Sequence, residues 1–202
     1  AEQLVQNGRT HSATLMRLVD ACFQYAGISP KEIDLVAVTN GPGSFTGLRI
    51  GVSAAKGLAW ALELPCCSVS TLEAMAENAR SFEGTVICAM DARRSQIYNA
   101  VFLAENGHLT RLTPDRAIAL EELAQELRED SRPKMVVGDG ARLCYDYLSG
   151  AGLSCRLAPP HLIMQNAASV ALEAEDLAAA GGLVSAQDLQ PVYLRSAQAP
   201  RL

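Results

Sequence analysis

The sequence predicts an α/β fold, because short apolar runs with strand character alternate with longer segments of helical character along most of its 202 residues. Residues 33–38 and 85–90 are examples of the former, and residues 12–26 and 47–62 of the latter. The alternation favours mixed sheets covered by helices. We expect two lobes, residues 1–84 and 85–202, with the last helix packing back on the first lobe.

The first lobe is expected to combine strands and helices in alternating order. Its predicted elements are a strand tail at 1–6, a turn at Asn7-Gly8, a helix at 12–26, a strand at 32–39, a helix at 47–62, a strand at 66–69 and a helix ending at Arg80. Gly27, just beyond the first helix, is typical of a C-terminal cap. Ser44 or Thr46 is expected to cap the second helix, and Ser70 or Thr71 the third.

The second lobe begins with two β segments and ends with a helix. Its predicted elements are strands at 85–90 and 96–103, a strand at 109–112, a helix at 119–128, a strand at 135–137, a turn at 138–140 and a helix from Asn166 to about Ala180. The Asn106-Gly107 pair between two β runs is typical of a hairpin turn.

The most informative segment reads TNGPGSFTGLRIG at residues 39–51, between a predicted strand and a predicted helix. Such a turn can direct backbone N–H groups toward an anion, or it can simply cap the helix. The residues of the candidate anion site are Gly41, Gly43, Ser44, Thr46 and Gly47. A P-loop is excluded, because Leu48 and Arg49 do not fit its Lys-Ser/Thr register.

The helices predicted at 12–26 and 47–62 each carry only a narrow polar stripe. Such helices are covered on two sides, either within a large core or at a subunit interface. The candidate interface residues are Leu15, Met16, Val19, Cys22, Phe23, Gly47, Ile50, Gly51, Ala54, Ala55 and Leu58. Small residues at 47, 51, 55 and 59 are expected to form a flat ridge for a neighbouring helix.

The composition indicates a globular protein of the cytoplasm. The chain is 49% hydrophobic and 19% charged with a net charge of −5, and no apolar run reaches the ~20 residues of a membrane span. The six cysteines include no Cys-x-x-Cys pair, so we expect reduced thiols that act as small apolar groups. An acidic chain is by itself a poor binder of nucleic acid, because phosphate contacts dominate such binding.

Several segments resemble the TsaB (YeaZ) family. They are GPGSFTGLRIG at 41–51, AKGLA at 55–59, VSTL at 69–72, MDAR at 90–93 and QPVYLR at 190–195, in the order expected for the family. The resemblance implies an actin/hexokinase-like (ribonuclease H-like) fold and a non-catalytic role without cofactor. The chain would be the partner of the enzyme TsaD in making N6-threonylcarbamoyladenosine at position 37 of certain tRNAs.

The resemblance also implies how the partners meet. TsaB-like proteins pair with TsaD through the two helices predicted at 12–26 and 47–62, and they can form homodimers through the same face. A TsaE-like ATPase is a further expected component, and tRNA is expected to bind only within the complex.

Comparison with the catalytic relative TsaD predicts that no metal binds. The His-x-Glu-Gly-His metal motif of TsaD aligns with TLEAM at residues 71–75, so Thr71 and Met75 replace both histidines and only Glu73 remains. A hydroxyl and a thioether do not substitute for two imidazoles. The three histidines, His11, His108 and His161, form no His-x-x-x-His pair. A metallopeptidase is therefore excluded.

Other polar residues allow two interpretations each. His11 either belongs to an Arg-x-His motif of the wider family or packs at the helix entry. Asp91 with Arg93 and Arg94 forms either a functional ion pair or a solvated turn. Asp139 in Gly-Asp-Gly is interpreted as a turn residue.

The resemblance leads us to expect that the chain starts within the third strand of the fold. Roughly 25–30 residues, the length of two strands and their turns, would then precede Ala1. The phosphate loop of actin/hexokinase-like proteins would belong to that segment. A small-molecule phosphotransferase is the alternative function on this fold, and it would need that loop and an acidic base.

Overall fold

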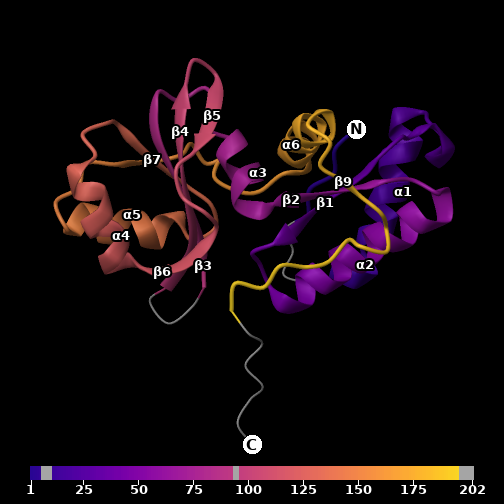
Figure 1. Cartoon of the computed structure of the whole chain (residues 1–202), viewed down its shortest axis with the longest axis horizontal. Coiled ribbons are helices and arrows are strands. Elements are labelled where there is room, and N and C mark those ends of the chain that lie inside the picture. The colour runs from indigo at the N-terminus through magenta and orange to yellow at the C-terminus, as the bar shows by residue number, and fades with distance from the viewer. Residues whose placement is uncertain (6–10, 93–95, 196–202) are drawn as a thin grey trace, which may run out of the picture. The chain divides into compact units, whose positions relative to one another are not determined.

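The structure of the chain, a computed structural model, describes residues 1–5, 11–92 and 96–195 (Figure 1). The predicted turn residues Asn7 and Gly8 lie outside these ranges, as do Arg93 and Arg94, which were expected in an ion pair or a solvated turn. The chain divides into two compact units. Unit 1 combines residues 1–69 with 166–193, and unit 2 combines residues 70–165 with the described residues from Leu194 onward. The division thus follows Val69 instead of lying near Gly84.

The described part of unit 1 contains a three-stranded sheet and three longer helices. The sheet has the order β1-β2-β9, with β1 at Val36–Gly41, β2 at Cys66–Ser70 and β9 at Leu183–Val184. The helices are α1 (Leu15–Ala26), α2 (Phe45–Leu62) and α6 (Ala167–Ala179), and the short 3-10 turns are η1 (His11–Ala13) and η2 (Pro30–Glu32). Figure 1 shows α2 and α6 on opposite sides of the strands.

The expected strand tail at the start of the chain is wrong for its described part, because residues 1–5 are irregular. Glu2 has a different role there. Its carboxylate accepts hydrogen bonds from the backbone N–H groups of Ala167 and Ala168, at 2.9 and 3.1 Å. A carboxylate at this position satisfies otherwise unpaired donors and favours the positive end of the α6 dipole.

Local capping chemistry explains the helix ends of unit 1. The backbone N–H of Gly27 closes α1 on the carbonyls of Phe23 and Gln24, as its position predicted. The Asn166 side chain accepts from the backbone N–H of Ser169 at 2.8 Å and so begins α6 where the sequence predicted.

The core of unit 1 lies between α2 and the sheet. Its buried apolar residues are Val36, Val52, Ala59, Cys66, Ala186 and Leu189. Lys56 fastens the C-terminal part of the unit to α2, because its ammonium donates to the carbonyls of Gln187 and Leu189 at 2.9 and 3.1 Å.

Unit 2 is built on a six-stranded mixed sheet. Its strands are β3 (Gly84–Asp91), β4 (Gln96–Glu105), β5 (His108–Arg111), β6 (Arg116–Ala119), β7 (Lys134–Val137) and β8 (Arg156–Leu157). They follow the order β5-β4-β3-β7-β8, with β6 paired to β4. β3 pairs antiparallel with β4, whereas β3, β7 and β8 are parallel. Asn106 and Gly107, with φ of 53° and 74°, form the predicted hairpin turn between β4 and β5.

Alternation along the central strands builds two apolar cores in unit 2. Val86, Cys88 and Met90 of β3 face α3 (Thr71–Glu77), whereas Ile87 and Ala89 face the other side. That second side is covered by α4 (Leu120–Glu126), its continuation η3 (Leu127–Glu129) and α5 (Ala141–Gly150). The sequence analysis missed α5, although its buried Ala141, Cys144 and Leu148 have the three- and four-residue spacing of an amphipathic helix.

All six cysteines are free, as predicted from their spacing. Cys66, Cys67, Cys88 and Cys144 are buried and serve as small apolar groups. Burial raises the pKa of the Cys88 thiol and that of Cys144, the latter to about 12, so both remain protonated. In the described part of the chain, no helix is long and apolar enough to cross a membrane.

Candidate functional site

The Gly-Pro-Gly turn of unit 1 holds the C-terminal motif of the chain against the end of β1. Gly41 has a φ of 144°, and a β-carbon at this position would lie 2.3 Å from the carbonyl oxygen of Val192. The backbone N–H of Val192 donates to the carbonyl of Asn40 at 2.7 Å. The Asn40 side chain donates to the carbonyl of Gln190 at 3.2 Å. The Gly-Pro-Gly turn and the motif at 190–195, which lie far apart in the sequence, therefore pack against each other.

The second half of this turn begins α2. The Ser44 hydroxyl accepts from the backbone N–H of Gly47 at 3.4 Å, so Ser44 is the N-cap. Since this bond occupies one of the N–H groups of the candidate anion site, it favours the capping interpretation. Anion binding by Gly41, Gly43, Ser44, Thr46 and Gly47 stays a prediction.

The first turn of α2 also carries an exposed aromatic cluster that the sequence analysis missed. The Arg49 guanidinium lies 3.9 Å from the ring centre of Phe45 and donates to the Tyr193 hydroxyl at 3.3 Å. The rings of Phe45 and Tyr193 are 5.0 Å apart, and both residues are 37% exposed. Phe45 and Tyr193 belong to the two motifs that Gly41 brings together, which is the signal that could have indicated the cluster.

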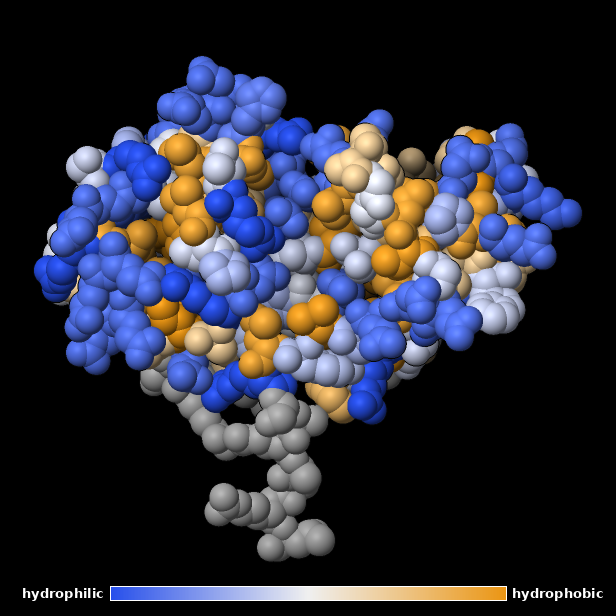
Figure 2. Space-filling model, viewed as in Figure 1, coloured by the Kyte–Doolittle hydropathy of each residue, from blue (hydrophilic) through white to orange (hydrophobic). Residues whose placement is uncertain are grey.

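Helix α1 is unusually accessible for an apolar helix. In the described structure none of its 12 residues is buried. Met16 is 49% and Tyr25 79% exposed. Figure 2 shows apolar side chains reaching the visible surface of unit 1 in patches.

A shallow apolar hollow lies beside α1. It has a volume of about 350 Å³, and α1 and residues 1–3 form most of its walls. Four of the predicted interface residues line it, namely Leu15, Val19, Cys22 and Phe23.

The predicted interface residues of α2 lie on two sides of the helix, some toward the sheet of unit 1 and others away from it. Gly51 faces its own sheet, since a β-carbon there would lie 3.9 Å from the Val38 side chain, and Ala59 is fully buried. Ala55 packs partly against the core of unit 1, so these members of the ridge lie toward the sheet, and contact of the ridge with a neighbouring helix stays a prediction. Ile50 and Ala54 lie on the opposite side of α2 and are half-buried.

The remaining α2 candidates lie at its flanks. Gly47 is half-buried beside the N-cap, and Leu58 packs partly against the core. Trp60, which the sequence analysis did not single out, is 68% exposed.

The positions that align with the metal ligands of TsaD do not form a cation site. Met75 is fully buried in the core of unit 2. Glu73 is held by Arg111, whose guanidinium lies 3.2 Å from its carboxylate and 2.6 Å from that of Asp115. Although burial opposes the charge of Arg111, hydrogen bonds to Asp115 and Glu73 raise its pKa. Across the described residues, no group of three or more potential metal ligands occurs. These residues do not fit a metal.

The other polar candidates are divided between the two units. His11 is exposed at η1, and its carbonyl accepts from the backbone N–H and hydroxyl of Thr14, at 3.1 and 3.2 Å. His108 and His161 are exposed in unit 2. Asp139 lies in the turn after β7, as predicted, and Asp91 ends β3.

Comparison with known proteins identifies one family. A family model described as TsaD, tRNA N6-adenosine threonylcarbamoyltransferase, matches residues 5–190. The tRNA threonylcarbamoyladenosine biosynthesis protein TsaB of Escherichia coli is 31% identical over 93% of this chain and 82% of that protein. TsaB of Bacillus subtilis is 36% identical over 71% of this chain. The chain spans 62% of the B. subtilis protein, less than two thirds of its length.

Two relatives provide further comparisons. The tRNA N6-adenosine threonylcarbamoyltransferase of Brucella ovis is 43% identical over 38% of this chain. The solved structure of YeaZ from Pseudomonas aeruginosa has a TM-score of 0.77 at 27% identity, covering 92% of this chain and 85% of that one. This similarity agrees with the mixed α/β, actin/hexokinase-like architecture expected from the sequence.

Proposed function

Since this chain belongs to the TsaB family, whose members are named for tRNA threonylcarbamoyladenosine biosynthesis, we propose that it is a non-catalytic activator subunit in that synthesis. Its partner would be a TsaD-like catalytic subunit. The contact would be made by α1 and by the outward side of α2. Such a role places the chain in the cytoplasm, with tRNA bound only in the complex.

The observation that carries this proposal is the accessibility of α1. The apolar residues of α1 are exposed or half-buried and none is buried, which is unfavourable unless a partner or a preceding segment of the protein covers them. Met16, Val19 and Phe23 share this surface, and Ile50 and Ala54 add an uncharged patch on α2. Such a surface suits a helical partner that is itself apolar.

The proposed lack of catalysis is supported by positions 71–75. Met75 is buried in the core of unit 2, and Glu73 is ion-paired with Arg111. A residue that already has these partners is not available to hold a metal. The chain would therefore act by binding one conformation of the catalytic subunit better than another, which shifts its population. A homodimer through the same helices, and a TsaE-like ATPase as a further component, belong to the same proposal.

Light scattering after gel filtration tests the proposal on the protein alone and mixed with the TsaD-like protein of the same genome. We expect a 1:1 complex that replaces any homodimer. Met16→Glu and Ala54→Glu would each place a charge in the contact. We expect each to weaken the complex by at least about tenfold, because an unpaired charge at an interface core is costly.

Leu143→Glu is the matched control, since Leu143 is a 43% exposed apolar residue on α5. It should leave the complex unchanged. Equal binding by all three variants would refute the proposed face. If no complex forms at all, an ATP-binding titration would test the alternative, a phosphotransferase of the same fold.

A further inference from the structure

Unit 2 carries a polar hollow at the start of two neighbouring parallel strands. It has a volume of about 460 Å³ and is lined by residues 130–134 and 152–156. The first segment leads into β7, and the second leads from α5 into β8. β7 and β8 pair side by side, with Met135 opposite Arg156. The fold therefore brings two loops with several basic side chains to one edge of the sheet.

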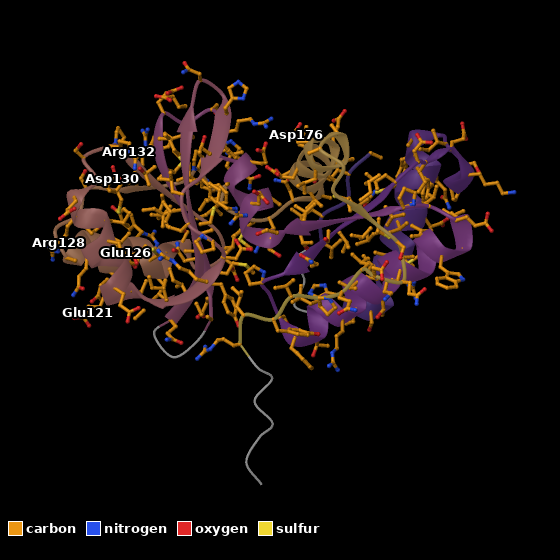
Figure 3. All side chains as sticks on the ribbon, in the orientation of Figure 1. Glu121, Glu126, Arg128, Asp130, Arg132 and Asp176 are labelled. Carbon is orange, nitrogen blue, oxygen red and sulfur yellow. The ribbon has the colours of Figure 1, made fainter. Side chains whose placement is uncertain are left out.

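Asp130 holds the first wall of this hollow, residues 130–134, in place through hydrogen bonds. Its carboxylate accepts from the backbone N–H of Arg132 at 3.0 Å and from the guanidinium of Arg132 at 2.8 and 3.2 Å. It also accepts from the Thr85 hydroxyl at 2.6 Å. Figure 3 shows Asp130 and Arg132 close together on this side of the unit. The wall is therefore ordered before any ligand binds.

The Asp130 carboxylate is ionised and already paired with neighbouring donors. Burial alone would raise the pKa of Asp130, but the hydrogen bonds from Arg132 and Thr85 and the charge of Lys134 lower it well below its ordinary value. The carboxylate is thus firmly ionised, and its two oxygens are occupied by the donors named above.

The basic side chains that line the hollow outnumber its one carboxylate, that of Asp130. Lys134 is only 6% exposed, and its ammonium donates to the carbonyls of Asp130 and Arg132. Arg156 is exposed and stacks over the ring of Phe82, 4.6 Å from its centre. Among the described residues, no ion pair joins Lys134 or Arg156 to a carboxylate.

The lining residues thus carry three cations, Arg132, Lys134 and Arg156, against one carboxylate, on a chain whose net charge is −5. Glu105 is a further acidic group whose field reaches Arg132. Figure 2 shows that the surface around α4, α5 and β7 is largely hydrophilic. The hollow is therefore a positively charged site on a protein whose net charge is negative.

We propose that this hollow binds the phosphate group of a phosphorylated ligand. A phosphate monoester carries nearly two negative charges at neutral pH, which matches the excess of two positive charges in the lining. The guanidinium of Arg156, already oriented by Phe82, offers paired N–H donors suited to phosphate oxygens. The hydroxyls of Ser131 and Ser154 add donors, and the volume is in the range of small-ligand sites.

The phosphate group has two sources, a small phosphorylated molecule or the backbone of RNA. Both present anionic phosphate oxygens to the hollow, but a monoester carries nearly two charges and a backbone phosphodiester carries one. This inference does not rest on the proposed function, because the hollow lies in unit 2, whereas the proposed interface lies in unit 1.

The test is a calorimetric titration of the purified protein at low ionic strength with three probes: inorganic phosphate, adenosine 5′-monophosphate and a short single-stranded RNA. We expect saturable binding that Arg156→Gln weakens about tenfold, the effect of losing one charge-assisted contact. Arg142→Gln is the matched control, because Arg142 is also an exposed arginine stacked on a ring, 5.9 Å from the centre of Tyr145. It should change the affinity less than about twofold.

The three probes separate the two sources. Binding of the two small probes indicates a small phosphorylated ligand, and binding of the RNA alone, with the same loss in Arg156→Gln, indicates an RNA backbone. Absence of saturable binding with every probe would overturn the proposal. Equal losses in Arg156→Gln and Arg142→Gln would also overturn it, since they would reveal attraction by general charge only.

Discussion

The carbonyl oxygen of Val192 lies 2.3 Å from the position that a β-carbon on Gly41 would occupy. The peptide of Val192 is also hydrogen-bonded to Asn40, the residue before Gly41. The C-terminal segment therefore passes so close to the end of β1 that it excludes any side chain at residue 41. The Phe45, Arg49 and Tyr193 cluster depends on this approach, because it joins side chains from the two segments.

Gly41→Ala should destabilise the protein by about 2–4 kcal/mol, because it combines a strained backbone angle with a collision against the backbone of Val192. Urea denaturation measures this change. Gly57→Ala is the control, since Gly57 lies within α2 with open space around it. That substitution should stabilise the protein by about 0.5–1 kcal/mol through helix propensity. Similar values for both variants would contradict the close approach.

Lys56→Met should loosen the C-terminal segment while keeping the apolar stem of the side chain. It removes both hydrogen bonds to the carbonyls of Gln187 and Leu189. We expect a loss of about 1–3 kcal/mol, typical of bonds to a charged donor. Hydrogen exchange should show faster exchange in residues 183–193. Unchanged exchange there would mean that Lys56 does not fasten this segment.

Ser70→Ala should weaken the start of α3. The Ser70 hydroxyl accepts from the backbone N–H groups of Leu72 and Glu73, both at 3.2 Å, and donates to Asp115 at 2.6 Å. We expect a loss of about 1–2 kcal/mol in thermal or chemical unfolding. Ser70→Asn, which keeps a capping acceptor, should recover part of this loss. No recovery would assign the effect to the bond with Asp115 instead.

Asp130→Asn should destabilise the protein in a pH-dependent way. The pKa of Asp130 is lower in the folded chain than in the unfolded chain, so its ionised form stabilises the fold above a pH of about 4, the unfolded value. This contribution is lost as the pH falls through the folded value. At pH 7 we expect a loss of about 1–3 kcal/mol. The difference between the two proteins, measured by urea denaturation, should narrow as the pH is lowered below 4, and a constant difference would contradict the assignment.

Features that rest on neighbouring residues could be predicted from the sequence. The caps at Gly27, Ser44, Ser70 and Asn166 all form as expected, because each needs only backbone groups a few residues away. The hairpin turn at Asn106-Gly107 forms for the same reason. The family resemblance likewise depended on local motifs in their order along the chain.

Features that rest on distant contacts could not be predicted in this way. The strand β6 is only four residues long and exists through its pairing with β4. The hollow formed by residues 130–134 and 152–156 appears only when β7 and β8 pair. The ridge of small residues on α2 indicated a close neighbour, but spacing alone did not distinguish another helix from the sheet beneath it.

The sequence by itself determined the alternation of strands and helices, their caps and turns, and the order of motifs that identifies the family, because these follow from short-range sterics and hydrogen bonds. The tertiary structure decided which side of each helix is covered and which side chains meet. Thus Gly51 faces β1, α1 remains accessible, and Arg156 and Lys134 line the same hollow. These outcomes depend on how strands far apart in the chain pair, and on the burial of apolar area that this pairing allows.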